Sequence, residues 1–239
     1  MNTPDPVRLL VHGASGRMGR AVLRLAAEAG GLAVVAAVSG SRPAQRVVDG
    51  VPQFAASELD GVPAFDVAID FSLPHGFERI LRLCTSRGAG LVSGTTGLSD
   101  EQQRAIDEAS IRVPVLVAAN FSLGVAVLSR LVEQAAAALP GWDCDIVETH
   151  HVHKKDAPSG TALALGARAG EGGAAPRYAS LRAGDVVGEH TVQFTSLGER
   201  LELVHRATDR DVFARGALHA ALRLADRGPG RVRLDDLLG

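Results

Sequence analysis

The sequence contains little cysteine and no long apolar run. Cys84 and Cys144 lie in unrelated segments of the 239-residue chain, so we expect two buried free thiols and no disulfide framework. The longest clean apolar run is 32–38, far short of the roughly 20 residues of a membrane span. Residues 1–6 have neither a basic region nor an apolar stretch, so we expect no signal peptide and a cytoplasmic protein.

An excess of positive charge is also absent. The chain has 25 Lys and Arg against 27 Asp and Glu, for a formal net charge of −2. A dedicated nucleic-acid-binding protein is usually strongly basic, so we expect no nucleic-acid partner, and any anion site must be a local basic cluster. Hydrophobic residues make up 46%, which is enough for a core in one large or two medium domains.

The first half of the chain alternates short apolar runs with amphipathic segments. Residues 7–11 predict a buried strand, 17–29 a helix and 32–38 a second strand, which together form one βαβ unit. The continuation predicts strands at 67–71, 89–93 and 113–119, helices at 76–86 and after Ser99, whose capping box is closed by Gln102, and an irregular segment at 39–64. Strands that alternate with helices predict an α/β fold with a doubly wound, mostly parallel sheet.

The second half has a different pattern. Its sequence predicts a long helix at 123–139, a strand at 145–153, a surface loop at 170–175, a hairpin of strands 191–197 and 201–206, and an amphipathic helix at 211–226. Because we expect no helices between these strands, the pattern predicts a second domain of the α+β class.

A glycine turn lies between the first predicted strand and helix. Gly13, Gly16 and Gly19 form a G-x-x-G-x-x-G motif, with Ser15 at the position where the dinucleotide fingerprint usually has its second glycine. Such a turn lets the backbone approach a pyrophosphate and directs helix N–H groups at it, so we expect a Rossmann-like dinucleotide site. The alternative is a tight turn that binds no ligand.

The end of the second strand bears on the choice of nucleotide. NAD-preferring sites usually have a carboxylate there, but this sequence has Ser39 followed by Gly40, Ser41 and Arg42. Arg42 could meet a 2′-phosphate, which favours NADPH over NADH. If Arg42 is only a solvated loop residue, this preference has no basis.

A basic segment after residue 148 carries the most specific signal. On a strand, His151 and His153 would share one face and His150 the other. Such a concentration of cations is costly to bury unless it meets anions. Pro158 is interpreted as the start of a helix whose first turn presents hydroxyls and N–H groups to a carboxylate; the residues concerned are Ser159, Gly160 and Thr161.

Two other interpretations of the basic segment remain open. Its histidines could bind a metal, although it has no HExxH spacing, no nearby cysteine pair, and a lysine, Lys154, that would repel a cation; we therefore expect no metal site. It could also be a solvated basic strand edge, which the following Pro-Ser-Gly-Thr turn disfavours.

The sequence resembles the dihydrodipicolinate reductase family, now named 4-hydroxy-tetrahydrodipicolinate reductase, over nearly the whole chain. Residues 148–162 meet the family pattern E-x-H-H-x-x-K-x-D-x-P-S-G-T-A, and residues 13–19, 94–97, 120–122 and 182–190 match further family segments. The chain departs from the family in having Ala118-Ala119-Asn120 where Ala-Pro-Asn is commoner, in lacking an acidic residue at Ser39, and in its short 39–64 segment.

The resemblance implies a reduction of a cyclic imino dicarboxylate by a nicotinamide nucleotide, in lysine and diaminopimelate biosynthesis. It implies His150 and Lys154 as the acid–base pair, with Lys154 favoured as the immediate donor in an order that the sequence leaves open. Substrate-binding residues would be His151, Lys154, Ser159, Gly160 and Thr161. Cofactor-binding residues would be Gly13, Ala14, Ser15, Gly16, Arg17, Met18, Ser39, Arg42, Phe71, Gly94, Thr95, Thr96, Ala118, Ala119, Asn120 and Phe121.

The resemblance also implies a domain division and an assembly. Residues 1–121 and 211–239 would form the dinucleotide-binding domain, and residues 122–210 the substrate-binding and oligomerisation domain of a homotetramer. Three other functions remain open: another Rossmann oxidoreductase such as an amino-acid or semialdehyde dehydrogenase, a nucleotide sensor that has lost the chemistry, and a metal hydrolase. The first conflicts with the 148–162 motif and the second with the presence of both His150 and Lys154.

Overall fold

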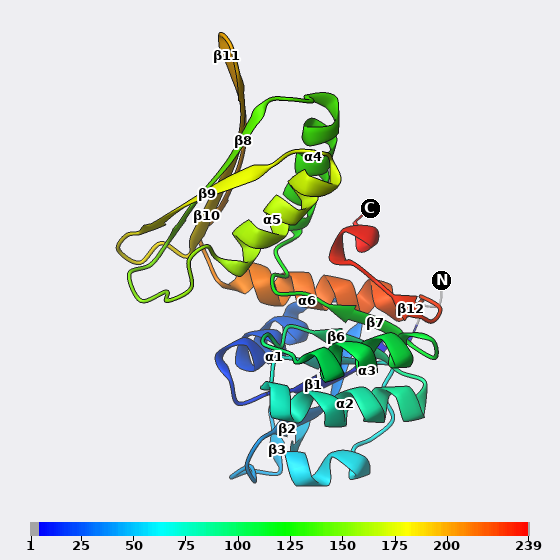
Figure 1. Cartoon of the computed structure of the whole chain (residues 1–239). Helices are drawn as coiled ribbons and strands as arrows, with labels where there is room; N and C mark the ends of the chain where they lie inside the picture. The colour runs from blue at the N-terminus through cyan, green and yellow to red at the C-terminus, as the bar shows by residue number, and fades with distance from the viewer. Residues whose placement is uncertain (1–4, 239) are drawn as a thin grey trace. The chain divides into compact units, whose positions relative to one another are not determined.

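The computed structural model describes residues 5–238 (Figure 1), and the chain divides into two compact units. Unit 1 contains residues 5–121 and Phe213–Leu237, and unit 2 contains Ser122–Val212 and Leu238. The expectation of no signal peptide rests mostly on residues 1–4, which lie outside the described part of the chain.

Unit 1 is built on an eight-stranded sheet with the order β12-β7-β6-β5-β1-β2-β4-β3. The strands are β1 (Val7–His12), β2 (Leu32–Ser39), β3 (Val47–Val48), β4 (Val51–Ala55), β5 (Val67–Asp70), β6 (Gly90–Ser93), β7 (Pro114–Val117) and β12 (Gly230–Arg231). All neighbours pair in parallel except β3 with β4. Strand order reverses between β1 and β5, and such a switch point is where doubly wound sheets bind ligands, outside the carboxyl ends of the strands.

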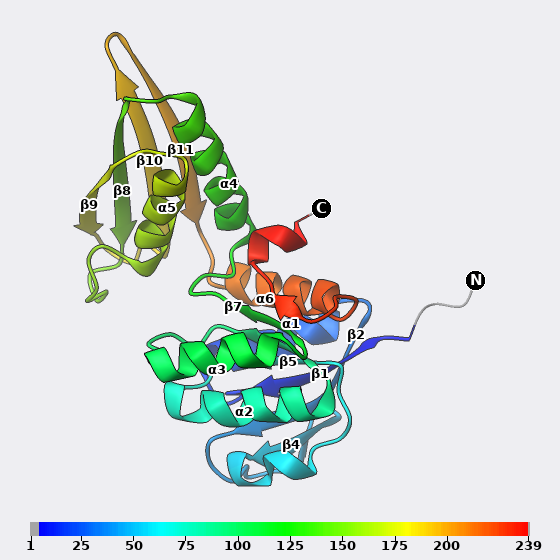
Figure 2. The same ribbon diagram turned by 45° about the vertical axis from the view of Figure 1, so that its right-hand side comes forward.

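Helices cover both faces of this sheet. They are α1 (Arg17–Glu28), α2 (Pro74–Arg87), α3 (Asp100–Ser110) and α6 (Asp211–Leu224), with short 3-10 helices at Ala56–Gly61 and Leu234–Leu237. Figure 2 shows α2 and α3 side by side, and buried residues of both pack with alternate residues of β1, β2, β5, β6 and β7. The predicted capping box is confirmed, because Gln102 N–H donates to Ser99 Oγ and Ser99 N–H donates to Gln102 Oε1.

The prediction that residues 39–64 are irregular is wrong. β4 extends the parallel sheet beside β2, pairing Gln53 to Ala55 with Ala37 to Ser39. The strand was not predicted because the segment contains Pro43, Pro52 and Pro63. Pro52 lies in β4 itself, at a position that pairs only with the short edge strand β3. Proline is tolerated there because β4 pairs on one side only at residue 52, as an edge strand does.

Unit 2 is a four-stranded mixed sheet with two helices on one face (Figure 2). The sheet order is β11-β10-β8-β9, formed by β8 (Asp143–His150), β9 (Pro176–Arg182), β10 (Gly188–Ser196) and β11 (Glu199–Ala207). Helices α4 (Leu123–Ala138) and α5 (Gly160–Glu171) pack against each other and bury residues such as Val132, Leu165 and Phe194. The hairpin predicted around Gly198 is confirmed as β10 and β11.

Three local predictions in unit 2 are wrong. β8 ends at His150, so residues 151–153 belong to a turn rather than a strand. Helix α5 does lie between two strands, because the unpredicted strand β9 pairs in parallel with β8. Pro158 precedes the Ser159 N-cap instead of opening the helix. β9 was missed because it is an edge strand in which no residue is fully buried, so its sequence, PRYASLR, lacks the apolar pattern of a buried strand.

Both cysteines are buried and free, as predicted. Among the described residues, no helix has the length and apolar character needed to cross a membrane.

Candidate functional site

The glycine turn in unit 1 is closely packed against the strand end of β5. Gly13 has φ of 78°, a left-handed conformation, and a Cβ added there would lie 2.5 Å from the Phe71 carbonyl oxygen. A Cβ on Gly19 would collide with the Gly13 carbonyl. Helix α1 then starts from Gly16 without a side-chain cap and with no acidic residue in its first turn. Its N–H groups therefore fit an anion such as a pyrophosphate.

A pocket of about 860 Å³ adjoins this turn. It is lined by Ala14 and Ser15 of the turn, by Ser39 at the end of β2, and by the following Arg42. Arg20 and Arg24 of α1 also line it; they are four residues apart and so lie on one face of the helix. The lining thus contains three arginines against a single carboxylate, Asp49, which suits an anionic ligand.

A buried carboxylate joins the carboxyl ends of three neighbouring strands. Asp70 accepts hydrogen bonds from His12 Nδ1 at 2.8 Å, Ser93 Oγ at 2.7 Å and Thr95 Oγ1 at 2.8 Å. Burial alone would raise the pKa of Asp70, but hydrogen bonds from His12, Ser72 and Ser93 outweigh it and lower the pKa. This network fixes the start of the 94–97 loop.

The predicted nicotinamide-side segments are brought together at the same strand ends. Ala118 N–H donates to the Ser93 carbonyl at 3.0 Å, which sets the segment after β7 beside the segment after β6. The rings of Phe71 and Phe121 meet edge to face, 5.7 Å apart. Gly94 packs under Phe71, where an added Cβ would overlap the ring.

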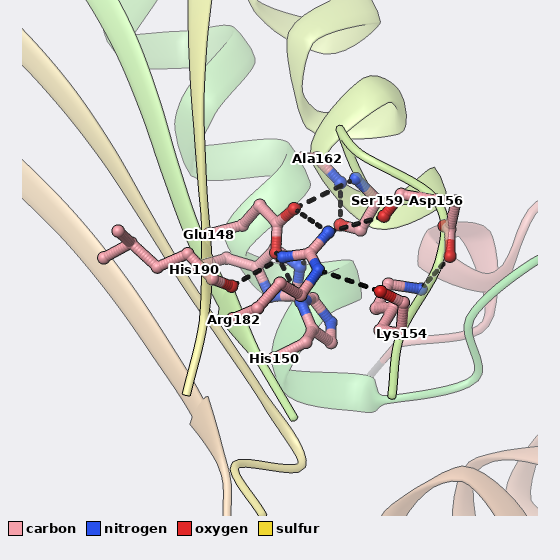
Figure 3. Close-up of polar contacts among 9 residues, drawn as sticks. Glu148, His150, Lys154, Asp156, Ser159, Ala162, Arg182 and His190 are labelled. Carbon is pink, nitrogen blue, oxygen red and sulfur yellow. Dashed lines mark hydrogen bonds and ion pairs between the residues drawn. The ribbon is translucent and has the colours of Figure 1, made fainter. Parts of the chain in front are cut away.

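In unit 2, the end of β8 presents a buried acid–histidine pair (Figure 3). Glu148 is completely buried, and its Oε2 is 2.5 Å from His150 Nδ1. Burial would raise the pKa of Glu148, but hydrogen bonds from Arg182, Ser180 and His150 lower it to about 2. An ionised carboxylate only accepts hydrogen bonds, so Nδ1 of His150 carries a proton, by inference from the network. Its Nε2 faces Gly188, where an added Cβ would approach to 3.0 Å.

Lys154 lies in the turn that follows β8. Its ammonium forms an ion pair with Asp156 at 2.8 Å, and this contact is the main cause that lowers the pKa of Asp156 (Figure 3). His151 and His153 lie close together, with ring centroids 6.2 Å apart, because of this turn and not because of strand alternation. Burial and then the charge of Arg210 lower the pKa of His151, whose buried Nδ1 has no hydrogen-bond partner among the described residues.

Helix α5 begins beside these groups. Ser159 is its N-cap: its Oγ accepts from Ala162 N–H at 3.2 Å, and its own N–H donates to Glu148 Oε1. Gly160 is exposed, and nothing lies within 4 Å of a Cβ added to it. His190 of β10 lies 3.3 Å from Ser159 Oγ and edge to face with His150. The first turn of α5 therefore lies next to His150 and His190, and its Gly160 backbone is hydrogen-bonded to Asp156, the partner of Lys154.

The structure thus gathers the predicted residues into two groups. Unit 1 brings Ala14 and Ser15 of the turn to Ser39 and Arg42 around the pocket, whose lining does not include the other predicted residues of the turn. Phe71, residues 94–96 and residues 118–121 lie at the strand ends. Unit 2 brings His150, through Glu148, and Lys154, through Asp156, to the start of α5, whereas His151 lies in the turn after β8. In the described residues 5–238, no group of three or more His, Cys, Asp or Glu side chains is placed to hold a metal ion.

Sequence reasoning assigned no role to Arg20, Arg24, Asp70, Arg182 or His190. Arg20 and Arg24 could have been predicted from the sequence, because arginines four residues apart on the helix after a glycine turn lie on one face of that helix. Arg182 and His190 lie within the 182–190 segment that matches the family, but their partners are 31 to 34 residues distant in sequence. Asp70 ends a buried apolar run, and the side chains that donate to it are 23 to 58 residues away.

The fold and the turn define unit 1 as a nucleotide-binding domain of the Rossmann type, with a separate α+β unit that carries the basic site. The family described as dihydrodipicolinate reductase, N-terminus, matches residues 7–121, and its C-terminal counterpart matches residues 124–238. The chain belongs to the dihydrodipicolinate reductase family.

Curated relatives carry the name 4-hydroxy-tetrahydrodipicolinate reductase. The protein of Stenotrophomonas maltophilia (strain R551-3) is 70% identical over 98% of both chains, and that of Xanthomonas campestris pv. campestris (strain B100) is 66% identical over 99% of both. Among solved structures, dipicolinate-bound dihydrodipicolinate reductase from Paenisporosarcina sp. TG-14 matches 98% of this chain and 100% of its own with a TM-score of 0.81. At 24% identity, that likeness shows the fold alone.

Proposed function

We propose that this protein reduces 4-hydroxy-tetrahydrodipicolinate to tetrahydrodipicolinate with a nicotinamide nucleotide, a step of lysine and diaminopimelate biosynthesis. Family membership over residues 7–121 and 124–238 and relatives of that name at up to 70% identity support the reaction. The observation that carries the proposal is the unit 2 site, where a buried Glu148–His150 pair and the Lys154–Asp156 ion pair lie at the start of α5.

Unit 1 is proposed to hold the nucleotide. Residues 13–18 would bind its pyrophosphate at the uncapped start of α1, and the nicotinamide would lie along Phe71, residues 94–96 and residues 118–121. When bound, the nucleotide supplies a hydride. The Asp70 network would keep the 94–97 loop in place for this role.

NADPH is the proposed nucleotide, with NADH as the alternative. A 2′-phosphate adds negative charge at the ribose, and the pocket at the end of β2 presents arginines and serines where NAD-preferring sites have a carboxylate. Arg42, Ser39 and Ser41 would contact the phosphate, and Arg20 and Arg24 would add to the positive field. The single acidic residue in the lining, Asp49, leaves that field positive.

The substrate is a dicarboxylate, and unit 2 has complementary groups for it. One carboxylate would accept N–H groups of Gly160 and Thr161 at the start of α5, with the helix dipole favouring negative charge. Ser159 would act from the cap position, and His151 and Lys154 would supply hydrogen bonds and positive charge. In the described structure the Asp156 carboxylate pairs with Lys154 and is hydrogen-bonded to the Gly160 backbone, so a substrate carboxylate would have to displace Asp156 from both groups.

Lys154 and His150 are proposed as the acid–base pair. Reduction builds electron density on the ring, and a proton must follow to neutralise it. Lys154 is the proposed immediate donor because its side chain is 22% exposed, whereas the His150 side chain is 10% exposed and bonded to Glu148. A positioned general acid typically contributes about 10²–10⁴-fold to the rate.

The variant Lys154→Ala tests this assignment. Turnover should fall by about 10²-fold or more, because the proton donor is lost, while the Kd for NADPH stays within about twofold. Turnover is measured from oxidation of NADPH and the Kd from nucleotide fluorescence. Lys155→Ala, which changes the exposed neighbouring lysine, is the matched control and should retain turnover. Full activity of Lys154→Ala would overturn the assignment.

Unit 2 is also the proposed site of homotetramer assembly in the cytoplasm. Both of its helices pack on one face of the sheet, which leaves the other face open, including Val147, Leu181 and Val204. Leu181 is 54% and Val204 41% exposed. Light scattering on the purified protein should give the mass of four chains; a monomer would contradict the assembly.

A further inference from the structure

Arg182, at the end of β9, uses every hydrogen-bond donor that it has. A guanidinium carries five N–H groups. Two donate to the carboxylate of Glu148, each at 2.9 Å, and one to the Leu181 carbonyl at 2.6 Å. The remaining two donate to the backbone carbonyls of Lys154 at 3.3 Å and Asp156 at 2.5 Å (Figure 3).

These bonds connect the two proposed acid–base residues. Glu148 links Arg182 to the His150 ring, because the same Glu148 Oε2 accepts hydrogen bonds from Arg182 and from His150 Nδ1. Through the carbonyls of Lys154 and Asp156, it holds the turn that carries the Lys154 side chain. A single side chain therefore bonds both to the carboxylate that His150 contacts and to the turn that carries Lys154.

The charge of Arg182 has a second consequence at the same place. Glu148 is completely buried, and a buried carboxylate is costly unless it is paired and hydrogen-bonded. Arg182 neutralises this carboxylate. Glu148 can therefore accept the hydrogen bond that orients His150 without presenting an uncompensated negative charge to a dicarboxylate substrate. Bidentate guanidinium–carboxylate pairs are geometrically specific in a way that an ammonium cannot reproduce.

We propose that Arg182 is a positioning residue of the reductase reaction, which holds His150 and Lys154 in register through Glu148 and the 151–156 turn. This inference rests on the proposed function. All five of its donors are occupied by the protein, so Arg182 acts on the substrate only through these other residues.

The substitutions Arg182→Lys and Arg182→Met test the proposal. Lysine has three donors, so Arg182→Lys loses at least two of the five hydrogen bonds that Arg182 makes while it retains the charge. Turnover should fall by about 10²-fold in both variants, the effect expected for a displacement of about 1 Å at the reacting groups. The KM for NADPH, which binds unit 1, should stay within about twofold of wild type.

A matched control separates positioning from general stability. Arg168 of α5 is also mostly buried and bridges Glu133 and Glu171, but at the other end of the helix from the site. Arg168→Met should lower the stability of unit 2 and leave turnover within about twofold of wild type. Free guanidinium, at concentrations that do not unfold the protein, should restore part of the turnover of Arg182→Met, and urea at equal concentration should restore none.

The outcomes are distinguishable. A wild-type protein without reductase activity overturns the proposed function itself. If wild type is active and Arg182→Lys keeps its turnover within about twofold, positioning by Arg182 is refuted. The proposal is also refuted if Arg168→Met loses turnover as severely as the Arg182 variants do. Should Arg182→Met fail to fold, Arg182→Lys carries the kinetic test, together with faster amide hydrogen exchange in residues 151–156.

Discussion

The buried histidine of β10 should make the stability of unit 2 depend on pH. His190 is 3% exposed, and burial, followed by the charge of neighbouring His150, lowers its pKa from 6.5 to about 4. Glu148 opposes this shift, whereas His205 of β11 and Lys154 of the turn add to it. Ser159 of α5 also faces the ring. At a pH between the folded value of about 4 and the unfolded value of 6.5, His190 is protonated in the unfolded chain and neutral in the folded chain.

The sign and size of the effect follow from this difference. The stabilisation is complete above the unfolded pKa of 6.5 and is lost as the pH falls towards the folded value of about 4. At about pH 5 the loss amounts to about 2 kcal/mol of unfolding free energy, and it reaches about 3 kcal/mol below both values. Glu148, with its pKa lowered from 4.5 to about 2, contributes its own loss only at lower pH.

Urea unfolding at about pH 8 and about pH 5 measures the effect. The single tryptophan, Trp142, lies in unit 2, so its fluorescence reports on this unit. His190→Asn removes the titrating ring and should reduce the stability difference between the two pH values by about 2 kcal/mol. His153→Asn, at an exposed histidine, is the control and should retain the wild-type difference. Equal differences in wild type and His190→Asn would refute the reasoning.

Three further substitutions probe the two sites. Arg42→Ser should raise the KM for NADPH about tenfold and leave that for NADH unchanged, because a charge-assisted bond to the 2′-phosphate is lost; an equal change for both nucleotides would argue against this contact. Asp70→Asn should destabilise unit 1 by about 1–3 kcal/mol in urea unfolding, since buried donors lose their acceptor, whereas Asp66→Asn at the exposed Arg8 pair should cost about 1 kcal/mol or less. Gly188→Ala places a Cβ against His150 Nε2 and should lower turnover without changing the Kd for NADPH; unchanged turnover would show that the ring adapts.

The parts of the fold that follow from local backbone preferences could be predicted from the sequence. The glycine turn, the Ser99 capping box and the Gly198 hairpin each depend on a few adjacent residues with distinct conformational demands. Apolar runs with intervening helices were enough to identify the parallel sheet, because strands buried on both faces are almost continuously hydrophobic. Strand β4 was not predicted because it contains Pro52, which is tolerated at a position that pairs on one side only.

The interior of the unit 2 site could not be predicted, because it depends on contacts between distant segments. The turn at 151–156 is held by Arg182, which is 26 to 28 residues away from the carbonyls that it binds. Because this contact is not visible in the sequence, the histidines were interpreted as part of the strand, which was expected to run to residue 153. Family resemblance named His150 and Lys154 but gave no reason for their spacing, which Glu148 and Arg182 supply.

Transfer of deuterium from the nucleotide to the product tests the central claim most directly. NADPH deuterated on the transferring face of the nicotinamide is mixed with the protein, and the substrate is generated in place from pyruvate and aspartate semialdehyde by the preceding synthase. The account predicts that NADPH is consumed and that tetrahydrodipicolinate gains the mass of a single deuterium. Protein that binds NADPH but transfers no label to this product would contradict the account.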